Sequence, residues 1–335
     1  MSTPSVIAPS IKHVTRRGFI GSVTVGSALS SAQNKEAVAP SRIIDTHTHF
    51  YDPTRPQGVP WPSRSETLLY RRTLPQDLRR VARGFPLAGT VVVEASPWLE
   101  DNQWLLDLAK DDSLIVGVVG HLEPGKPAFK DHLQRFAKNR LFRGIRLEEK
   151  TIAAGLSEKT FIADLERLAD ADLEVDVIGE NTMLTHLVTL SDRIAHLRLV
   201  INHLPFDRAA DEDTARKVRN ALSELGRRPQ IFAKVSGVLR RVNGRVPGEA
   251  SFYKQSLDRL WDTFGVDRLV YGSNWPVSEL LAPYPTVVQV VREYFRDKGV
   301  EATERYFLKN SLAAYKSGLI DGSSGDAAFF GRIAL

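Results

Sequence analysis

The stretch RIIDTHTHF, residues 42–50, is an apolar run that ends in two histidines separated by one residue. Side chains alternate along a β-strand, so His47 and His49 are expected on one face, at the end of the strand. Similar short apolar runs recur along the chain, and each is followed by a longer amphipathic stretch. This alternation predicts parallel strands joined by helical crossovers.

Eight such pairs can be counted from residue 42 onward. The predicted strands are residues 42–50, 89–96, 115–123, 142–149, 174–179, 198–204, 230–238 and 268–276. A doubly wound open sheet would show the same alternation, but no glycine-rich phosphate turn follows the first predicted strand. Eight pairs favour closure, so we predict a single α/β domain folded as a (β/α)8 TIM barrel.

The composition is that of an ordinary globular domain. The chain has 335 residues, of which 42% are hydrophobic and 25% charged, and its net charge is +5. Lysines and arginines are mostly interleaved with acids, which disfavours nucleic-acid binding and leaves a small molecule as the expected partner. There is no cysteine, so a metal would need ligands such as histidine or carboxylate. The oligomeric state stays open.

The N-terminus has the features of an export signal. Arg16 and Arg17 are followed by Phe19 and by a weakly apolar run of small residues that ends near Ala32. This pattern is typical of a twin-arginine signal and predicts a periplasmic protein, with a plain disordered tail as the alternative. No apolar run is long enough to span a membrane. The predicted segments are a signal peptide (1–32), a linker (33–41), the barrel (42–317) and a C-terminal tail (318–335).

One connection is much longer than the others. Residues 51–74 are rich in proline and carry Trp61. A loop this long is uncommon unless it covers a site, and it follows the end of the first strand, where barrel enzymes place their chemistry. We expect it over the barrel mouth with Trp61 near a substrate, while a solvated connection is the alternative.

Three histidines are the strongest candidates for catalysis. His47 and His49 can form half of a divalent metal site or an acid–base pair. His203 ends the predicted sixth strand and would complete a cluster. Histidines that only satisfy hydrogen bonds in the core are the alternative.

Four residues are candidates for substrate binding. Arg146 is expected to point inward near the top of the fourth strand, where a guanidinium can bind a carboxylate or a lactone carbonyl. An ion pair with a nearby glutamate is the alternative. The other candidates, which could instead pack in the interior, are Trp61, Lys234 and Trp275.

Together these motifs resemble the amidohydrolase superfamily. The likeness rests on His-Thr-His after an apolar first strand, on His203, and on the turn GSNWP at residues 272–276. More narrowly, the motifs PWP, LLYRRTLPQDL, GIR, LVINHL and AKVSG resemble the branch that includes L-fucono- and L-rhamnonolactonases and 2-pyrone-4,6-dicarboxylate lactonase. The resemblance covers about residues 42–315 and implies catalytic roles for His47, His49, His203 and the residue at position 274.

One position departs from the family's pattern. The eighth strand in this family usually ends in Asp, which accepts the proton of the attacking water, whereas this chain has Asn274. An amide can orient a water but cannot act as a base near neutral pH. Either a histidine or a carboxylate such as Glu94, Glu123 or Glu148 takes the proton, or hydrolysis is slow or absent.

The resemblance implies no metal or one divalent ion, with zinc expected. His47, His49 and His203 supply three ligands, whereas zinc takes about four. The leading function is hydrolysis of the ester bond of a sugar-acid or related carboxylated lactone, by water attack at the C-terminal mouth of the barrel. A metal-dependent decarboxylase of the same superfamily and a non-catalytic sugar-acid-binding barrel are the alternatives.

Overall fold

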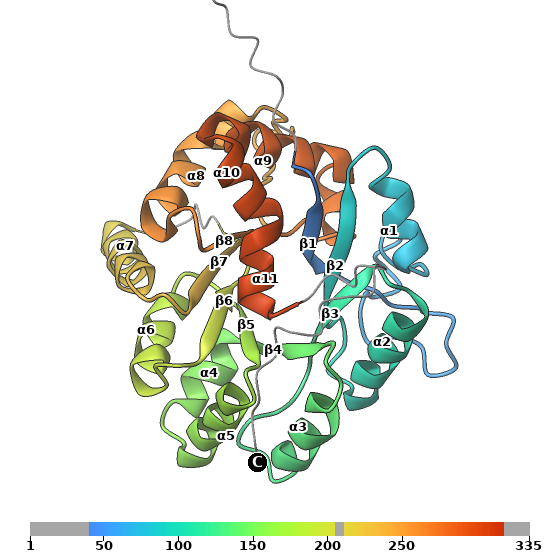
Figure 1. Cartoon of the computed structure of the whole chain (residues 1–335), viewed down its shortest axis with the longest axis vertical. Coiled ribbons are helices and arrows are strands. Elements are labelled where there is room, and N and C mark those ends of the chain that lie inside the picture. Colours follow the sequence, from blue (N-terminus) through green and yellow to red (C-terminus); the bar gives the residue numbers. More distant parts are fainter. Residues whose placement is uncertain (1–39, 205–210, 318–335) are drawn as a thin grey trace, which may run out of the picture. The chain divides into compact units, whose positions relative to one another are not determined.

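The computed structural model describes residues 40–204 and 211–317. The predicted signal peptide, most of the predicted linker and the predicted C-terminal tail lie outside these residues, so those predictions stand as made. Strands and helices alternate through the described part of the chain (Figure 1).

Eight parallel strands pair in chain order within one sheet. They are β1 (Ile43–Thr48), β2 (Leu87–Val93), β3 (Ile115–Gly120), β4 (Phe142–Glu148), β5 (Glu174–Ile178), β6 (Arg198–Ile201), β7 (Ile231–Val235) and β8 (Leu269–Tyr271). The end of β1 meets the turn after β8 through a parallel bridge between Thr48 and Trp275. The sheet is therefore a nearly closed barrel, and the predicted (β/α)8 fold is confirmed.

Helices surround the barrel, and α11 crosses one of its ends (Figure 1). They are α1 (Pro75–Val81), α2 (Leu99–Asp111), α3 (Phe129–Ala137), α4 (Glu149–Gly155), α5 (Lys159–Asp170), α6 (Met183–Arg193), α7 (Glu212–Gly226), α8 (Ala250–Phe264), η1 (Val277–Leu280), α9 (Tyr284–Lys298), α10 (Val300–Glu304), η2 (Arg305–Lys309) and α11 (Asn310–Tyr315). In α5, for example, Phe161, Leu165 and Leu168 recur at helical spacing and are buried. None of the described helices is long and apolar enough to cross a membrane.

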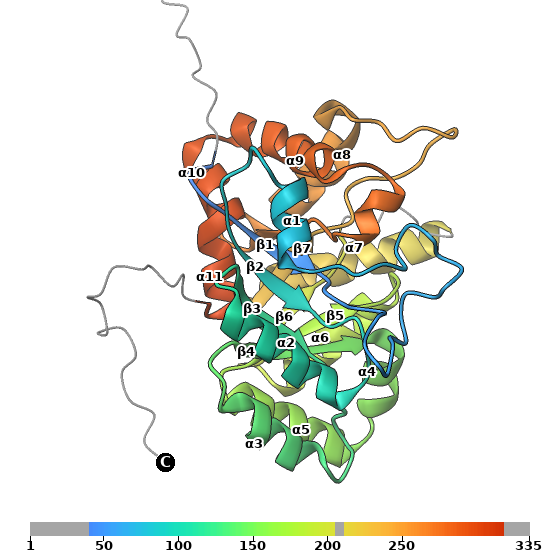
Figure 2. The ribbon, with the colours of Figure 1, turned by 90° about the vertical axis from the view of Figure 1, so that its right-hand side faces the viewer.

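The strands are buried on both faces, which explains why they read as continuous apolar runs. Inside the barrel, Ile44, Val91, Val116 and Val270 form a second apolar cluster, distinct from the core beneath the helices. Tyr315 of α11 joins this cluster, and α11 lies at the end of the barrel opposite the long loop after β1 (Figure 2). Chemistry is therefore possible only toward the other end, at the barrel mouth.

All eight strands end earlier than predicted, and in two of them the difference matters for the site. The sixth ends at Ile201 rather than at residue 204, and the eighth at Tyr271 rather than at residue 276. His203 and Asn274, which follow them, both have a φ of +59°. This left-handed conformation is incompatible with an extended strand, so each residue begins a turn instead.

The long loop after β1 is fastened to the barrel. Tyr51 and Thr73 exchange backbone hydrogen bonds of 3.0 and 2.9 Å, which joins the two ends of the loop. Arg55 forms an ion pair of 2.9 Å with Asp101 of α2, and its guanidinium lies over the ring of Trp104. The loop is therefore held in place at its base and along its length.

Candidate active site

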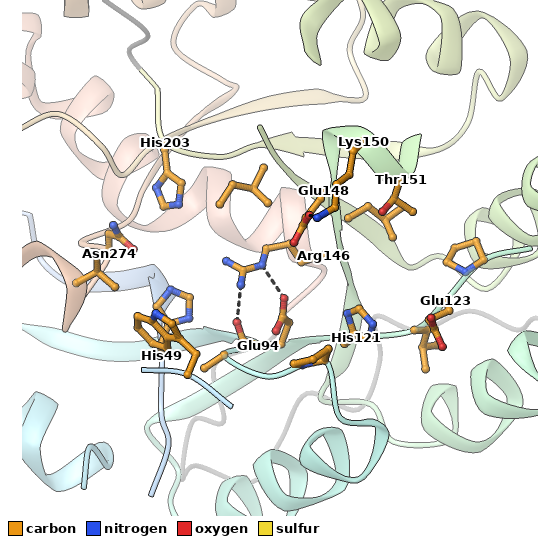
Figure 3. Close-up of a pocket in the computed structure, with 18 of the residues that line it drawn as sticks. His49, Glu94, His121, Glu123, Arg146, Glu148, Lys150, Thr151, His203 and Asn274 are labelled. Atoms are coloured by element: carbon orange, nitrogen blue, oxygen red, sulfur yellow. Dashed lines mark hydrogen bonds and ion pairs between the residues drawn. The ribbon is translucent and has the colours of Figure 1, made fainter. Parts of the chain in front are cut away.

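A cavity of about 740 Å³ opens at the C-terminal ends of the strands (Figure 3). Among the residues predicted from the sequence, it is lined by His49, Trp61, Arg146, His203 and Asn274. The structure thus brings together side chains from four strand ends and from the loop after β1.

The three predicted histidines form one cluster, in which His49 and His203 line the cavity and His47 lies beneath them, outside its lining. The ring centroids of His47 and His49 are 5.0 Å apart, and those of His47 and His203 are 4.5 Å apart. His47 is fully buried, and its Nε2 has no hydrogen-bond partner within the described part of the chain. The cluster therefore contains a buried polar atom that is left for a ligand or a water.

Two of these imidazoles are oriented through Nδ1. In His49, Nδ1 donates to the backbone carbonyl of Val93 at 2.9 Å. Because a carbonyl can only accept, Nε2 of His49 carries the lone pair. In His203, Nδ1 lies 3.0 Å from the hydroxyl of Ser236, which also accepts the backbone N–H of His203 at 3.0 Å. Both rings are therefore held in fixed orientations.

The surroundings keep all three imidazoles neutral. Burial lowers the pKa of both His49 and His203 to about 3, and the Arg146 cation adds to the effect. Burial, reinforced by the Lys234 cation, holds the pKa of His47 well below its usual range. The histidines are thus uncharged at any ordinary working pH.

Arg146 extends from β4 into the centre of the cavity (Figure 3). Its Nε donates to Oε1 of Glu94 at 2.8 Å, and its Nη2 donates to the Glu94 backbone carbonyl at 2.8 Å. The sequence leaves an ion pair with a glutamate and a position facing a ligand as alternatives for Arg146, and the structure combines the two. These two bonds orient the guanidinium and leave Nη1 for a ligand.

Asn274 and His203 share an unusual backbone conformation. The left-handed φ of +59° costs a non-glycine residue roughly 1–2 kcal/mol. Such residues concentrate at functional sites, where the surrounding structure holds them. Both side chains line the cavity from the residues that follow β6 and β8 (Figure 3).

Asp45 connects the first and last strands beneath the site. Its Oδ1 accepts the backbone N–H of Ser273 at 2.8 Å and that of His47 at 3.2 Å. A Cβ at Gly272 would lie 2.8 Å from the Cβ of His47, so β8 can approach this closely only with glycine there. Burial raises the pKa of Asp45 to about 6. Sequence reasoning gave Asp45 no role, since a single aspartate on a strand carries no distinctive signal.

Two of the predicted substrate-binding residues do not line the cavity. Lys234 is fully buried, and its Nζ lies 2.5 Å from Oδ2 of Asp176 inside the barrel. Trp275 is also buried; it packs on Phe50 and donates its indole N–H to Glu279 at 2.8 Å. A substrate in the cavity would therefore meet neither side chain directly.

Some cavity residues were missed by the sequence reasoning. His121, one residue after β3, and Lys150, at the start of α4, both line the cavity. All three glutamates considered as a replacement base, Glu94, Glu123 and Glu148, line it as well. The strand-end position that singled out His203 would also have identified His121.

The donor set fits a zinc ion poorly. The described residues contain no group of three His, Cys, Asp or Glu side chains arranged to hold a metal. Neutral imidazoles are ordinary zinc ligands, but three of them are one short of the usual four. The cations Arg146 and Lys234, whose charges lower the pKa values of the three imidazoles, also disfavour a further positive charge beside them. Asn274 replaces the carboxylate that would offset this charge.

The chain is similar to proteins of known family. A profile of the family described as amidohydrolase matches residues 44–316. Two L-fucono-1,5-lactonases, from Burkholderia multivorans and Burkholderia ambifaria, are each 30% identical; the matches span 81% and 84% of this chain and 94% and 97% of those proteins. The crystal structure of an amidohydrolase from Burkholderia multivorans with bound zinc has a TM-score of 0.72 and 25% identity, covering 82% of this chain and 99% of that one. A protein from Pseudomonas putida, described as a putative 2-pyrone-4,6-dicarboxylic acid hydrolase, has the same fold as this chain. Its crystal structure has a TM-score of 0.61 and 20% identity, covering 82% of this chain and 97% of that one.

Proposed function

Because the chain belongs to the amidohydrolase family, we propose that it hydrolyses the ester bond of a lactone, either a sugar-acid lactone or a related carboxylated one. The observation that carries this proposal is the cluster of neutral imidazoles beside Arg146 at the floor of the cavity. The 30% identity to two L-fucono-1,5-lactonases supports the lactone as substrate class.

Arg146 binds the carbonyl oxygen of the lactone in this proposal. Its Nη1 faces the cavity because Nε and Nη2 are held by Glu94. A fixed donor aimed at an oxygen that gains negative charge lowers the barrier, since it does not have to reorganise during the reaction. Glu94 is thus the residue that positions Arg146.

His49 accepts the proton of the attacking water. Its Nε2 carries the lone pair because Nδ1 donates to the Val93 carbonyl. The amide oxygen of Asn274 and the imidazole of His203 hold the water. As the water oxygen bonds to the carbonyl carbon, its proton passes to Nε2; the tetrahedral intermediate then breaks the ring C–O bond, and Nε2 returns the proton to the departing alkoxide.

Metal analysis combined with lactone assays tests this proposal. The purified protein is assayed with a panel of sugar-acid lactones before and after treatment with a chelator, and its zinc content is measured. We expect hydrolysis to survive chelation. About one zinc per chain with chelator-sensitive activity would instead make His47 and His49 ligands and overturn the role of His49 as proton acceptor. No turnover of any lactone, with or without added zinc, would favour a binding protein.

We also propose that the protein is exported to the periplasm by the twin-arginine route. The support is the sequence of residues 1–32, with Arg16 and Arg17 before a run of small apolar residues. Cell fractionation of the full chain and of the Arg16→Lys/Arg17→Lys variant tests it. Export of the wild type alone is the expected result, whereas equal distribution of both would contradict it.

A further inference from the structure

A buried lysine inside the barrel is not used by the mechanism above. Nζ of Lys234 lies 2.5 Å from Oδ2 of Asp176, and both side chains are completely buried. The hydroxyl of Tyr315 donates to Oδ1 of Asp176 at 2.8 Å, so both carboxylate oxygens have a donor. Burial lowers the pKa of Lys234, and the Asp176 carboxylate opposes that shift. A contact this short with a carboxylate is a charge-assisted hydrogen bond, as expected of an ammonium ion.

The same ammonium contacts the catalytic cluster. Nζ of Lys234 lies 3.3 Å from Nδ1 of His47. An ammonium has three protons and no lone pair, so it can only donate to Nδ1. Lys234 therefore favours the form of His47 in which Nδ1 has no proton.

Asn202, the second neighbour of His47 Nδ1, is compatible with a ring that has no proton on Nδ1. The Asn202 side-chain oxygen is drawn 3.1 Å from Nδ1, an arrangement that leaves the Asn202 NH2 group with no partner in the part of the chain described. The oxygen and nitrogen of an amide occupy nearly the same positions, so Asn202 can present its NH2 group to the ring instead. The amide can adapt to either form of His47, whereas the ammonium cannot.

We propose that Lys234 is a positioning residue that fixes His47 as the tautomer with its proton on Nε2. The unpartnered Nε2 of His47 is then an N–H donor, whereas Nε2 of His49 presents a lone pair. Given the lactone hydrolysis proposed above, the Nε2–H of His47 lies beneath the cavity lining formed by His49 and His203 and adds a positive dipole below the carbonyl oxygen that Arg146 binds, while His49 takes the proton. The two histidines of the HTH motif thus have opposite roles, and His47 in this form cannot bind a metal through Nε2.

Nitrogen NMR of the full chain labelled with ¹⁵N-histidine tests the tautomer directly. Two-bond correlations between ring protons and nitrogens show which nitrogen carries the proton, and spectra of His47→Gln and His49→Gln assign the two rings. We expect Nε2 to be protonated in His47 and Nδ1 in His49. A proton on Nδ1 of His47, or a metal on its Nε2, would overturn the proposal. The measurement needs no substrate, so its outcome is independent of whether a lactone is turned over.

A pair of substitutions tests the role of Lys234. Lys234→Met alone leaves Asp176 as a buried charge without a cationic partner and is expected to unfold the protein, so the variant of choice is Lys234→Met/Asp176→Asn. We expect the proton of His47 to move to Nδ1, the signals of His49 to stay, and kcat to fall about 100-fold with little change in KM, the loss typical of one donor to the developing charge.

The matched control is Lys217→Met/Asp213→Asn, which removes an exposed ion pair of 2.8 Å on α7. It should leave the spectra and kcat unchanged. If the Lys234 double variant folds and keeps the wild-type tautomer of His47, Lys234 does not set it.

Discussion

The two sides of the cavity differ in how firmly their side chains are held (Figure 3). On the histidine side, formed by His49, His203 and Asn274 above the buried His47, hydrogen bonds at Nδ1 fix both His49 and His203. On the charged side, Glu148 and Lys150 form an ion pair of 2.6 Å, but their side chains are 59% and 81% exposed. Fixed buried groups can stabilise a transition state, whereas exposed ion pairs contribute about 0–1 kcal/mol. The histidine side is therefore suited to chemistry and the charged side to recognition of substituents.

The largest effect should come from the histidine side. His203→Asn removes an imidazole that holds the attacking water, and we expect turnover to fall at least about 1,000-fold. The fold should not change, which circular dichroism and thermal unfolding would check. Retained activity in a folded His203→Asn variant would remove this residue from the mechanism.

A smaller loss of activity is expected from substitutions of Arg146 and Glu94, which lie between the two sides. Arg146→Lys keeps the charge but cannot make both bonds to Glu94, so kcat should fall about 100-fold. Glu94→Gln keeps an oxygen that accepts from Nε and should lose less than about tenfold. If Glu94→Gln is as inactive as His203→Asn, Glu94 rather than His49 is the base.

Substitutions on the charged side should change substrate binding, measured as KM, and leave kcat unchanged. Glu148→Gln/Lys150→Met removes an exposed pair, and we expect KM to change by less than about fivefold and kcat to stay constant, because such pairs contribute about 0–1 kcal/mol. Steady-state kinetics on several lactones would show which substituents this side contacts. A large fall in kcat would mean that the division between the two sides is wrong.

The smallest effect on activity should come from lowering the pH. The pKa values of His49 and His203 lie near 3, so both imidazoles keep their lone pairs as the pH falls through 6.5, where a free histidine would become protonated. Activity that depends on neutral histidines should be lost only as the pH approaches about 3. We expect the histidines to cause no decline in kcat/KM between pH 7 and pH 5, over the range in which the fold is intact. Asp45, whose pKa is about 6, is a buried group beneath the site that titrates in this range, so the profile is measured for the wild type and for Asp45→Asn. A decline with a midpoint near 6.5 that persists in Asp45→Asn would contradict the neutral cluster.

The fold and half of the site could be predicted because both depend on position along a strand. Parallel strands buried on both faces appear as apolar runs, and the residues that follow them meet at the barrel mouth. That is why the sequence alone predicts His49, His203 and Asn274 at the site. The sequence does not show how deep a side chain lies along the barrel axis. Lys234 points inward as alternation predicts, yet it lies below the cavity.

Alternation also fails beyond the end of a strand. Asn274 has a left-handed backbone, so the direction of the next side chain no longer follows the pleat, and Trp275 packs against Phe50 instead of lining the cavity. The role of Asp45 was also hidden, because its partners are backbone N–H groups that leave no mark on the sequence.

The turn after β8 has an evolutionary consequence. Its shape is held by backbone hydrogen bonds, by the hydroxyl of Ser273 and by Asp45, and none of these involves the side chain of Asn274. The left-handed conformation admits glycine, asparagine and aspartate readily and disfavours β-branched residues. One substitution can therefore exchange acid and amide at this position without rebuilding the scaffold, and a lineage can alter its proton chemistry while its barrel stays the same.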